Sequence, residues 1–458
     1  MAHKKDSAVN KAWEYLIEKF NILTNVRMGN VVHLSSDDLN ATKKVIEAKG
    51  SIDARLMAKF DTAADLPPIF QEFNLDILPT GRGHYVVSDF ILYHRIPDLE
   101  DVENIKEMNI KFLESLDANN ITNENTAILA ASISGILEDF LQTDKNIMTL
   151  SSRMGTGEFS FYVERKENKP IEINVRKAQI EIDGGFENSD SIVLVEAKNV
   201  LNEDFNIRQL YYPLRTWSQK LKKPIRNLFL IYVNKTFFLF EYRFKDLNNF
   251  SSIELVKSGA YILNQTKLSF DNLLRIHRVI NPEINDSLEG SKVPFPQADS
   301  FYRIISLMEA IDDADRASLN NNQITELMGL TTRQTSYYTA AGVYLGVFDR
   351  IHGYTFLTDT GKQIVRADYS DRIFFFARLL FKHQIFSDTF AFIVENIGLE
   401  EYAKSIGIEW RKHRTIVKRY VMNRMEELNI LDGEAMINRR SQTVIMWLKW
   451  LSKQIKYW

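Results

Sequence analysis

The stretch QIEIDGGFENSDSIVLVEAKNV, residues 179–200, contains two short apolar runs that each end in charged side chains. Side chains alternate between the two faces of a β-strand, so Glu196 and Lys198 share one face at the end of the second run. By the same alternation, Glu181 and Asp183 share one face of the first run. If the two runs are neighbouring strands, Asp183 and Glu196 end side by side. Paired carboxylates of this kind suit a hard cation such as Mg²⁺.

The charged side chains of this stretch could support hydrolysis. A cation held by Asp183 and Glu196 would polarise a phosphoryl oxygen and lower the pKa of a bound water. Lys198 could orient or deprotonate that water, and could stabilise negative charge at phosphorus. Gly184 and Gly185 would allow the chain to turn directly after Asp183. The alternative is structural: Asp183 closes a turn, while Glu196 and Lys198 mark a solvated strand end.

The spacing of these residues resembles a known nuclease motif. Asp183, twelve intervening residues and then Glu196-Ala197-Lys198 are similar to the core of the PD-(D/E)xK nucleases, which include many type II restriction endonucleases. Ile182 replaces the proline of that motif and leaves the ligands unchanged. The resemblance implies that Asp183, Glu196 and the Ala197 carbonyl bind one or two Mg²⁺ ions. It also implies that Lys198 is the catalytic lysine.

The resemblance extends to the helices on either side of the motif. Nucleases of this superfamily usually add a carboxylate from the helix before the first strand. Glu138 in GILEDFL is our candidate, ahead of Asp139. The helix after the motif often contributes a glutamine, and Gln209 in NIRQLYY matches that position. The implied fold is a restriction-endonuclease-like α/β core with a mixed sheet flanked by helices.

Composition limits the classes of protein that fit. The chain has 458 residues, of which 45% are hydrophobic and 26% charged, as in ordinary soluble globular proteins. It contains no cysteine, which excludes disulfides and thiolate metal sites. No apolar run approaches the ~20 residues of a membrane span, and the N-terminal sequence does not resemble a secretory signal. We therefore expect a cytoplasmic protein with no membrane partner.

Hydrophobic patterning predicts four parts. A helix over residues 121–142, capped by Thr122 or Asn123, precedes several strand-like segments and a helix around 206–221. A proline-containing connector at 281–299 is the clearest boundary, and the chain after it is mainly helical. The expected parts are an N-terminal domain that could contact DNA (1–110), the catalytic domain (111–280), a winged-helix domain (295–370) and a basic, second winged-helix-like domain (371–458).

Residues 300–366 resemble a winged helix-turn-helix. Helices are predicted at 300–311, 322–330 and from 331 onward with Thr331 as cap, followed by a two-strand wing and a further helix. The third helix would be the recognition helix, and its first turns carry Arg333, Gln334 and Tyr337. Arginine pairs with guanine and glutamine with adenine in the major groove. Alternatively, the unit serves dimerisation or packing.

The C-terminal segment is basic. Residues 411–458 contain 11 Lys and Arg against 4 Asp and Glu, although the whole chain has a net charge of −3. Arg411, Lys412, Arg414 and Lys418 fall in a predicted long helix and suit contacts with DNA phosphates, which position a protein without specifying sequence. A solvated helix face is the alternative. Arg82, between two glycines, could approach a phosphate or a base edge, with an ordinary turn residue as the alternative.

These features together predict a Mg²⁺-dependent, site-specific double-stranded DNA endonuclease of a restriction-modification system. Cleavage of both strands requires two active sites, so we expect a homodimer on DNA. A cognate DNA methyltransferase would act in the same system without forming a stable complex. Two alternatives remain open: a non-catalytic winged-helix regulator, which would bind DNA without cutting it, and a repair nuclease that recognises DNA structure.

Overall fold

The protein is described here by a computed structural model. The described residues are 7–46, 52–102, 105–110, 113, 115–117, 120–263, 268–283, 294–313, 317–404, 410–431 and 433–456. Part of the expected connector (284–293) and of the turn expected before the basic helix (405–409) lie outside them.

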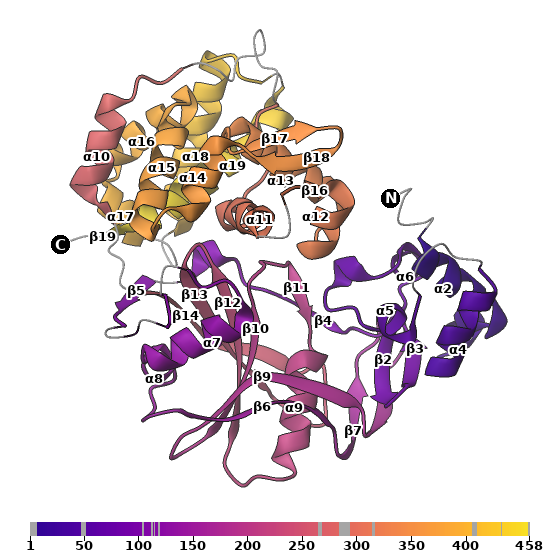
Figure 1. The fold of residues 1–458 in the computed structure, drawn as a ribbon. Coiled ribbons are helices and arrows are strands. Elements are labelled where there is room, and N and C mark those ends of the chain that lie inside the picture. Colours follow the sequence, from indigo (N-terminus) through magenta and orange to yellow (C-terminus); the bar gives the residue numbers. More distant parts are fainter. Residues whose placement is uncertain are drawn as a thin grey trace.

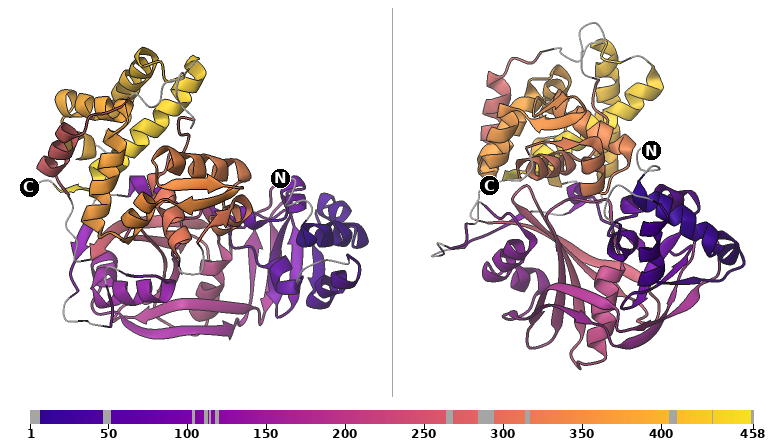
Figure 2. Two further views of the ribbon diagram at one scale, coloured as in Figure 1. Left: turned by 45° about the horizontal axis from the view of Figure 1, so that its top comes forward. Right: turned by 45° about the vertical axis from the view of Figure 1, so that its right-hand side comes forward.

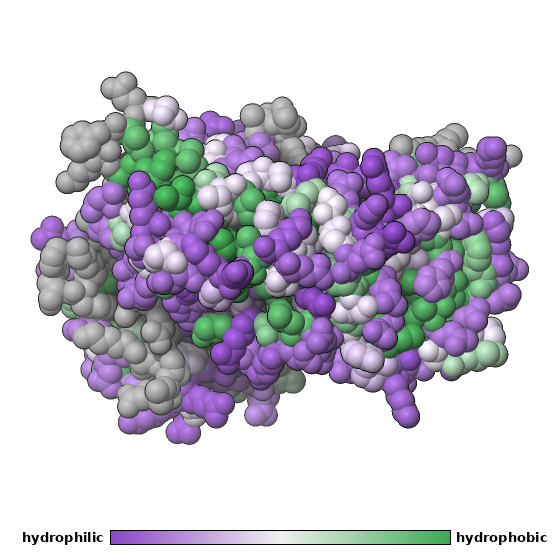
Figure 3. Space-filling view, turned by 90° about the horizontal axis from the view of Figure 1, so that it is seen from below, coloured by the Kyte–Doolittle hydropathy of each residue, from purple (hydrophilic) through white to green (hydrophobic). Residues whose placement is uncertain are grey.

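Three regions are visible in the molecule (Figure 1). The N-terminal region lies beside a larger central sheet, and the helical C-terminal region covers one end of that sheet, as both views of Figure 2 also show. The expected mixed α/β class, with mixed sheets and a helical C-terminal region, is confirmed. Figure 3 shows the face turned away from the C-terminal helices, where apolar and hydrophilic residues are interspersed. No helix in the described ranges is both long and apolar enough to cross a membrane.

The N-terminal region is built around a five-stranded sheet in the order β1-β3-β2-β8-β7. Its strands are β1 (Val32–Ser35), β2 (Asp76–Gly81), β3 (His84–Ser88), β7 (Glu158–Val163) and β8 (Ile171–Arg176). Its helices are α2 (Ala8–Lys19), α3 (Ile22–Arg27), α4 (Ser36–Ala41), η1 (Thr42–Lys44), α5 (Ala54–Ala58), η2 (Ala63–Asp65) and α6 (Pro68–Glu72). Trp13 and Phe70 are fully buried between these helices and the sheet.

The central sheet has seven strands in the order β5-β14-β13-β12-β10-β9-β6. These are β5 (Ile105–Met108), β6 (Ile147–Gly155), β9 (Gln179–Glu187), β10 (Ile192–Lys198), β12 (Ile225–Val233), β13 (Thr236–Phe244) and β14 (Ile253–Leu263). The sheet is mixed because β10 pairs in parallel with β12, and β14 with β5, while the other pairs are antiparallel. A two-stranded ribbon of β4 (Tyr93–Arg95) and β11 (Asp204–Asn206) lies beside it, and η3 (Leu99–Asp101) precedes β5.

Helices cover both faces of the central sheet. On one face, α7 (Glu124–Ile133) and α8 (Ile136–Leu141) pack against Val193 and Val195 of β10. On the other, α9 (Arg208–Ser218) connects β10 to β12, and its Trp217 packs with Leu194. The cap of α7 is Asn123, whose side chain accepts the Thr126 N–H at 2.8 Å. Alternation along β10 therefore places its apolar residues against both helical layers.

The C-terminal region begins with β15 (Leu268–Ser269) and α10 (Phe270–Val279). It continues as α11 (Phe301–Asp312), β16 (Leu319–Asn320), α12 (Asn321–Leu327), α13 (Thr332–Tyr344), β17 (Phe348–Ile351), β18 (Tyr354–Leu357) and α14 (Asp359–Arg366). The remaining elements are α15 (Tyr369–Phe381), α16 (Gln384–Asn396), α17 (Leu399–Lys404), α18 (Trp410–Glu427), α19 (Glu434–Lys453) and β19 (Ile455–Lys456). The strands β16, β18 and β17 form a small sheet, while β19 pairs with β15. Among the described residues of the expected second winged-helix-like domain (371–458), the elements are helices and the short strand β19, so no wing accompanies α18 there.

The sheets do not separate at the boundary expected near residue 110. The hairpin β7–β8 joins the N-terminal sheet, in which Gly81 of β2 pairs with Arg176 of β8. Conversely, β5 forms an edge of the central sheet. Sequence order alone could not reveal this exchange, because strand pairing is a long-range choice.

Candidate active site

The pair formed by β9 and β10 separates at Asp183. The two strands pair from Glu187 opposite Ile192 to Gly184 opposite Val195. Beyond that point β9 pairs only with β6, and the Asp183 Oδ2 atom accepts the Ala197 N–H at 3.0 Å. The carboxylate therefore replaces a backbone acceptor at the fork, which fixes Asp183 against the end of β10.

The sequence predicted a turn directly after Asp183, and this prediction is wrong. Strand β9 continues through both glycines to Glu187. A Cβ atom on Gly185 would lie 2.6 Å from the Leu150 Cβ atom, and one on Gly184 would lie 3.0 Å from the Ile128 Cγ2 atom. The glycines therefore allow β6 and α7 to approach the strand closely, and they do not end it.

Glu196 and Lys198 lie together at the end of β10, as alternation predicts. The Lys198 Nζ atom is 2.6 Å from the Glu196 Oε1 atom, and both side chains are largely buried. The Gln209 Nε2 atom, from the first turn of α9, donates to the same oxygen at 2.5 Å. The structure thus brings Asp183, Glu196, Lys198 and Gln209 to one place.

A further acid at this place was missed in the sequence. Glu124, the first residue of α7, lines the same cleft. Burial raises the pKa of Glu124; Lys198 opposes the shift and Asp183 adds to it. Glu138, the sequence candidate, lies one helix further along, where its Oε1 atom accepts the Asn146 N–H at 2.8 Å. The single helix predicted over residues 121–142 is two helices, α7 and α8, separated at Ser134 and Gly135, where Gly135 has a φ of +78°. The first turn of α7 supplies the acid because that end faces the fork.

The electrostatics of the site follow from burial and crowding. Burial raises the pKa of Glu196 to about 7; Lys198 opposes this shift, while Asp183 reinforces it. Burial alone would lower the pKa of Lys198, but Glu196 and Glu124 outweigh it and hold that pKa above its ordinary value. Lys198 is therefore protonated at neutral pH, where its neighbour Glu196 is close to the midpoint of its titration.

These residues lie in a cleft of about 760 Å³ that is formed by all three regions. Residues 55–65 and 79–85 of the N-terminal region contribute one wall. Glu326 and Leu327 of α12 contribute from the C-terminal region. The acidic residues of the cleft are Asp61, Asp65, Glu124, Glu181, Asp183, Glu196 and Glu326.

Three domain families of unknown function match the chain. Their models are Domain of unknown function (DUF6996) over residues 10–87, Domain of unknown function (DUF6997) over 88–262 and Domain of unknown function (DUF7226) over 303–456. No curated protein and no solved structure matches the chain. The cleft contains residues from all three matched segments, so it lies where the three similarities meet.

The predicted base-reading residues lie at the start of α13. Thr331 caps this helix through a capping box with Gln334. The Gln334 Nε2 atom also donates to the Glu203 Oε1 atom at 2.6 Å, which ties the helix to the central region. Arg333 is exposed, and its Nε atom is 2.5 Å from the Tyr337 hydroxyl. Arg333 is thus the most exposed of the three predicted base-reading residues.

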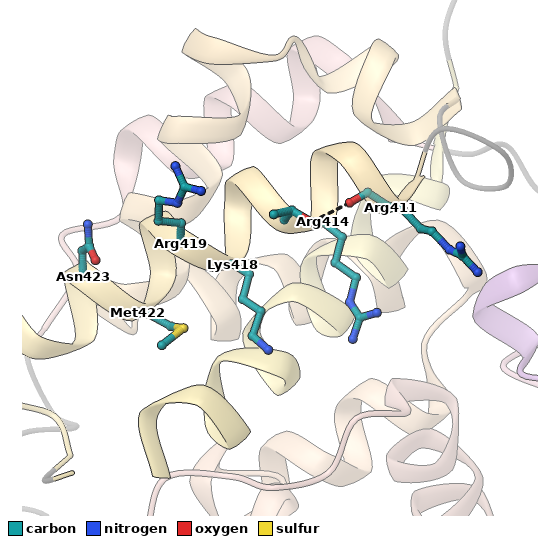
Figure 4. A pocket seen from close by; sticks show the side chains of 7 residues that line it. Arg411, Arg414, Lys418, Arg419, Met422 and Asn423 are labelled. Atoms are coloured by element: carbon teal, nitrogen blue, oxygen red, sulfur yellow. Dashed lines mark hydrogen bonds between the residues drawn. The ribbon is translucent and has the colours of Figure 1, made fainter. Parts of the chain in front are cut away.

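The basic residues of α18 line a separate groove of about 550 Å³. Figure 4 shows Arg414 and Lys418 extending in the same direction from α18, whereas Arg419 points away from them. Arg411 also lines the groove, while Lys412 is exposed and outside its lining. Arg414 donates to the Gln442 side chain of α19 at 2.8 Å. The sequence prediction of a basic helix at this position is confirmed.

Proposed function

We propose that the protein is a Mg²⁺-dependent, site-specific endonuclease of double-stranded DNA. The observation that carries this proposal is the Lys198 ammonium beside Glu196, at a strand fork where Asp183 and Glu124 also face the cleft. Burying charged groups is costly even when they are paired, so a purely structural strand end has little reason to bury Glu196 and Lys198 together. Their concentration in a cleft is typical of a functional site.

The order of elements around the site supports a restriction-endonuclease-like core. Helices α7 and α8 and strands β6 to β8 precede β9 and β10 in the chain. The short strand β11, helix α9 and then β12, which pairs in parallel with β10, follow them. The acids come from α7 and the two forked strands, and the glutamine from α9. This order agrees with the resemblance of the sequence to PD-(D/E)xK nucleases.

The residues present fit a hard cation. Mg²⁺ is commonly held by one or two carboxylates together with waters and phosphate oxygens. Asp183 and Glu196 would hold it with the Ala197 carbonyl, and Glu124 lies in the same cleft, close enough to interact with Asp183 and Lys198. Among the described residues no group of three or more His, Asp or Glu side chains is arranged around a metal position. A pair of carboxylates is nevertheless sufficient for this ion.

In the proposed reaction, water attacks phosphorus, one phosphorus–oxygen ester bond breaks, and the leaving oxygen gains a proton. Bound Mg²⁺ would polarise the phosphoryl oxygen and make the water more acidic. Lys198 would stabilise negative charge developing at phosphorus, because its raised pKa keeps it protonated and unsuited to act as a base. Gln209 would orient Glu196 through its hydrogen bond.

The C-terminal region supports DNA recognition. The order α11-β16-α12-α13-β17-β18, with its three-stranded sheet, is typical of a winged helix-turn-helix. Arg333 and Tyr337 of α13 are the base-reading candidates, and the basic groove of α18 suits phosphate contacts. We propose that a homodimer forms on DNA, because each chain carries one such site and two strands are cut.

The test is a digestion of methylated and unmethylated plasmid DNA with Mg²⁺ or with EDTA, comparing the wild type with Lys198→Ala. We expect discrete Mg²⁺-dependent fragments from the wild type and a loss of at least ~100-fold in the variant. Lys245→Ala, which removes an exposed lysine paired with Glu254 outside the cleft, is the matched control. Intact DNA under all conditions, with retained binding, would indicate a regulator and contradict the proposal.

A further inference from the structure

The cations of the cleft fall into two groups. They are Arg55, Lys59, Arg82, Arg153, Lys198 and Arg208. Three form ion pairs with cleft carboxylates: Lys59 with Asp61 at 3.5 Å, Arg153 with Glu181 at 2.7 Å and Lys198 with Glu196 at 2.6 Å. Among the described residues no ion pair engages the other three, and all three are arginines.

Arg82 is presented by a tight turn between β2 and β3. Gly83 has a φ of +73°, and a Cβ atom there would lie 2.7 Å from the Ser36 Oγ atom. A Cβ atom on Gly81 would lie 3.0 Å from the Arg176 carbonyl oxygen. The two glycines therefore let the turn pack closely against its neighbours, and the exposed Arg82 side chain is left at the cleft.

Arg208 lies on α9, next to the glutamine that contacts Glu196. Its guanidinium carbon is 6.0 Å from the centre of the Tyr212 ring. Burial raises the pKa of the Tyr85 hydroxyl on β3, and the charge of Arg208 opposes that shift. Arg208 therefore lies close to the strand that follows Arg82. Arg55, in the last turn of α5, is exposed on the same wall.

This wall is fixed by direct hydrogen bonds to α9 and β11, the elements that follow β10 in the chain. The Tyr212 hydroxyl donates to the Pro79 carbonyl oxygen at 2.7 Å. The Asn206 N–H donates to the Asp61 carbonyl oxygen at 2.9 Å, and the Ala63 N–H to the Asp204 Oδ1 atom at 2.8 Å. The three arginines are thus held at set positions relative to Lys198.

We propose that Arg55, Arg82 and Arg208 bind the DNA phosphates next to the one that is cut, an inference that rests on the proposed function. A guanidinium group matches the two oxygens of a phosphate with parallel hydrogen bonds. The cleft has seven acidic and six cationic side chains, so it lacks a general positive field. Direct contact by the three unpaired arginines is therefore what holds the strand in the cleft.

The experiment measures binding of a fluorescein-labelled DNA duplex of mixed sequence by anisotropy over a series of KCl concentrations. It uses Lys198→Ala with Mg²⁺, so that DNA stays intact. Arg55→Ala, Arg82→Ala and Arg208→Gln are each added to this background. Because each phosphate contact adds about 0.9 to the slope of log affinity against log salt, we expect each variant to lower the slope by about one. Affinity at fixed salt should fall several-fold.

Arg95→Ala is the matched control, since Arg95 is exposed, paired with Asp98 and outside the cleft. Its slope should equal that of the background. Unchanged slopes in all three arginine variants would overturn the inference, even if the wild type cuts DNA. If the slopes fall but the wild type never cuts DNA, the nuclease proposal fails and the phosphate contacts stand. Folding of each variant is checked by its thermal transition.

Discussion

Asp76, the first residue of β2, has a side chain that is fully buried from solvent. Burial raises its pKa to about 7, although Lys166, 2.8 Å away, opposes the shift. A carboxyl whose pKa is higher in the folded than in the unfolded chain stabilises the fold at low pH. That contribution is lost as the pH rises through the folded pKa.

Asp76→Asn should therefore flatten the pH dependence of stability. Between pH 4 and pH 8 we expect the free energy of unfolding of the wild type to fall by about 2–4 kcal/mol relative to the variant. Urea unfolding at several pH values measures this difference. A constant offset between the two proteins would contradict the shift, because loss of the Lys166 contact alone does not depend on pH in this range.

Gln209 acts through Glu196 and is a positioning residue. Gln209→Ala should lower kcat by about tenfold, as loss of a hydrogen bond to a metal-binding side chain commonly does, and should leave DNA affinity unchanged. Gln219→Ala is the control, because Gln219 follows the same helix and contacts the Glu158 carbonyl oxygen instead. Equal losses in both variants would indicate a general effect on α9.

At the scale of elements, the approach of β6 and α7 to β9 depends on glycine. Gly185→Ala should lower the free energy of unfolding by about 1–3 kcal/mol, because the added methyl would overlap the Leu150 side chain. Gly155→Ala on β6 meets no atom within 4 Å and should change stability by less than about 0.5 kcal/mol. Thermal or urea unfolding compares the two. Similar losses would show that backbone freedom, and not space, matters at Gly185.

The helices α13 and α18 should affect DNA binding differently. Arg333→Ala should relax the base preference at one position of the DNA recognition sequence. The free energy of binding to DNA with the preferred base should weaken by about 1–3 kcal/mol. Lys418→Ala should weaken binding to all sequences alike and reduce the salt slope by about one. Binding selection from a random DNA library, with salt titration, separates these effects. A changed base preference in Lys418→Ala would contradict the division of roles.

At the scale of the whole molecule, the three regions depend on one another. The β7–β8 hairpin completes the N-terminal sheet, and the Ser306 hydroxyl accepts the Leu201 N–H at 3.0 Å between α11 and the central region. One continuous apolar cluster extends from Leu78 in β2 to Ile455 at the end of the described chain. We therefore expect the regions to unfold together.

A fragment of residues 88–280 should consequently aggregate or lack a cooperative transition, although it contains the catalytic residues. The full chain should show a single calorimetric transition. Expression and scanning calorimetry of both proteins test this expectation. A soluble fragment with its own sharp transition would show that the central sheet is stable without its neighbours.

Local pattern was sufficient to identify the elements that carry the site. Alternation placed Glu196 and Lys198 on one face of a strand, and the 3.6-residue period with its caps located α7, α9 and α13. Such features depend on residues close in sequence. The exposed β6 was missed because it lacks a buried face, and the pairing of β7–β8 with β2 lies beyond any local signal.

The sequence by itself determined the two strands that carry Asp183, Glu196 and Lys198, the helix with Gln209 that follows them and the basic helix α18, whereas the fork at Asp183 came from the strand pairing. Only the tertiary structure decided that Glu124, and not Glu138, faces the fork, because that depends on which end of a helical segment meets the strand ends. It also decided that Arg82 faces the same cleft as Asp183, since about 100 residues and two sheets separate them in the chain. Residue types and their spacing indicate which side chains could take part in the chemistry. The packing of segments that are distant in the sequence decides which of those side chains reach the same cleft.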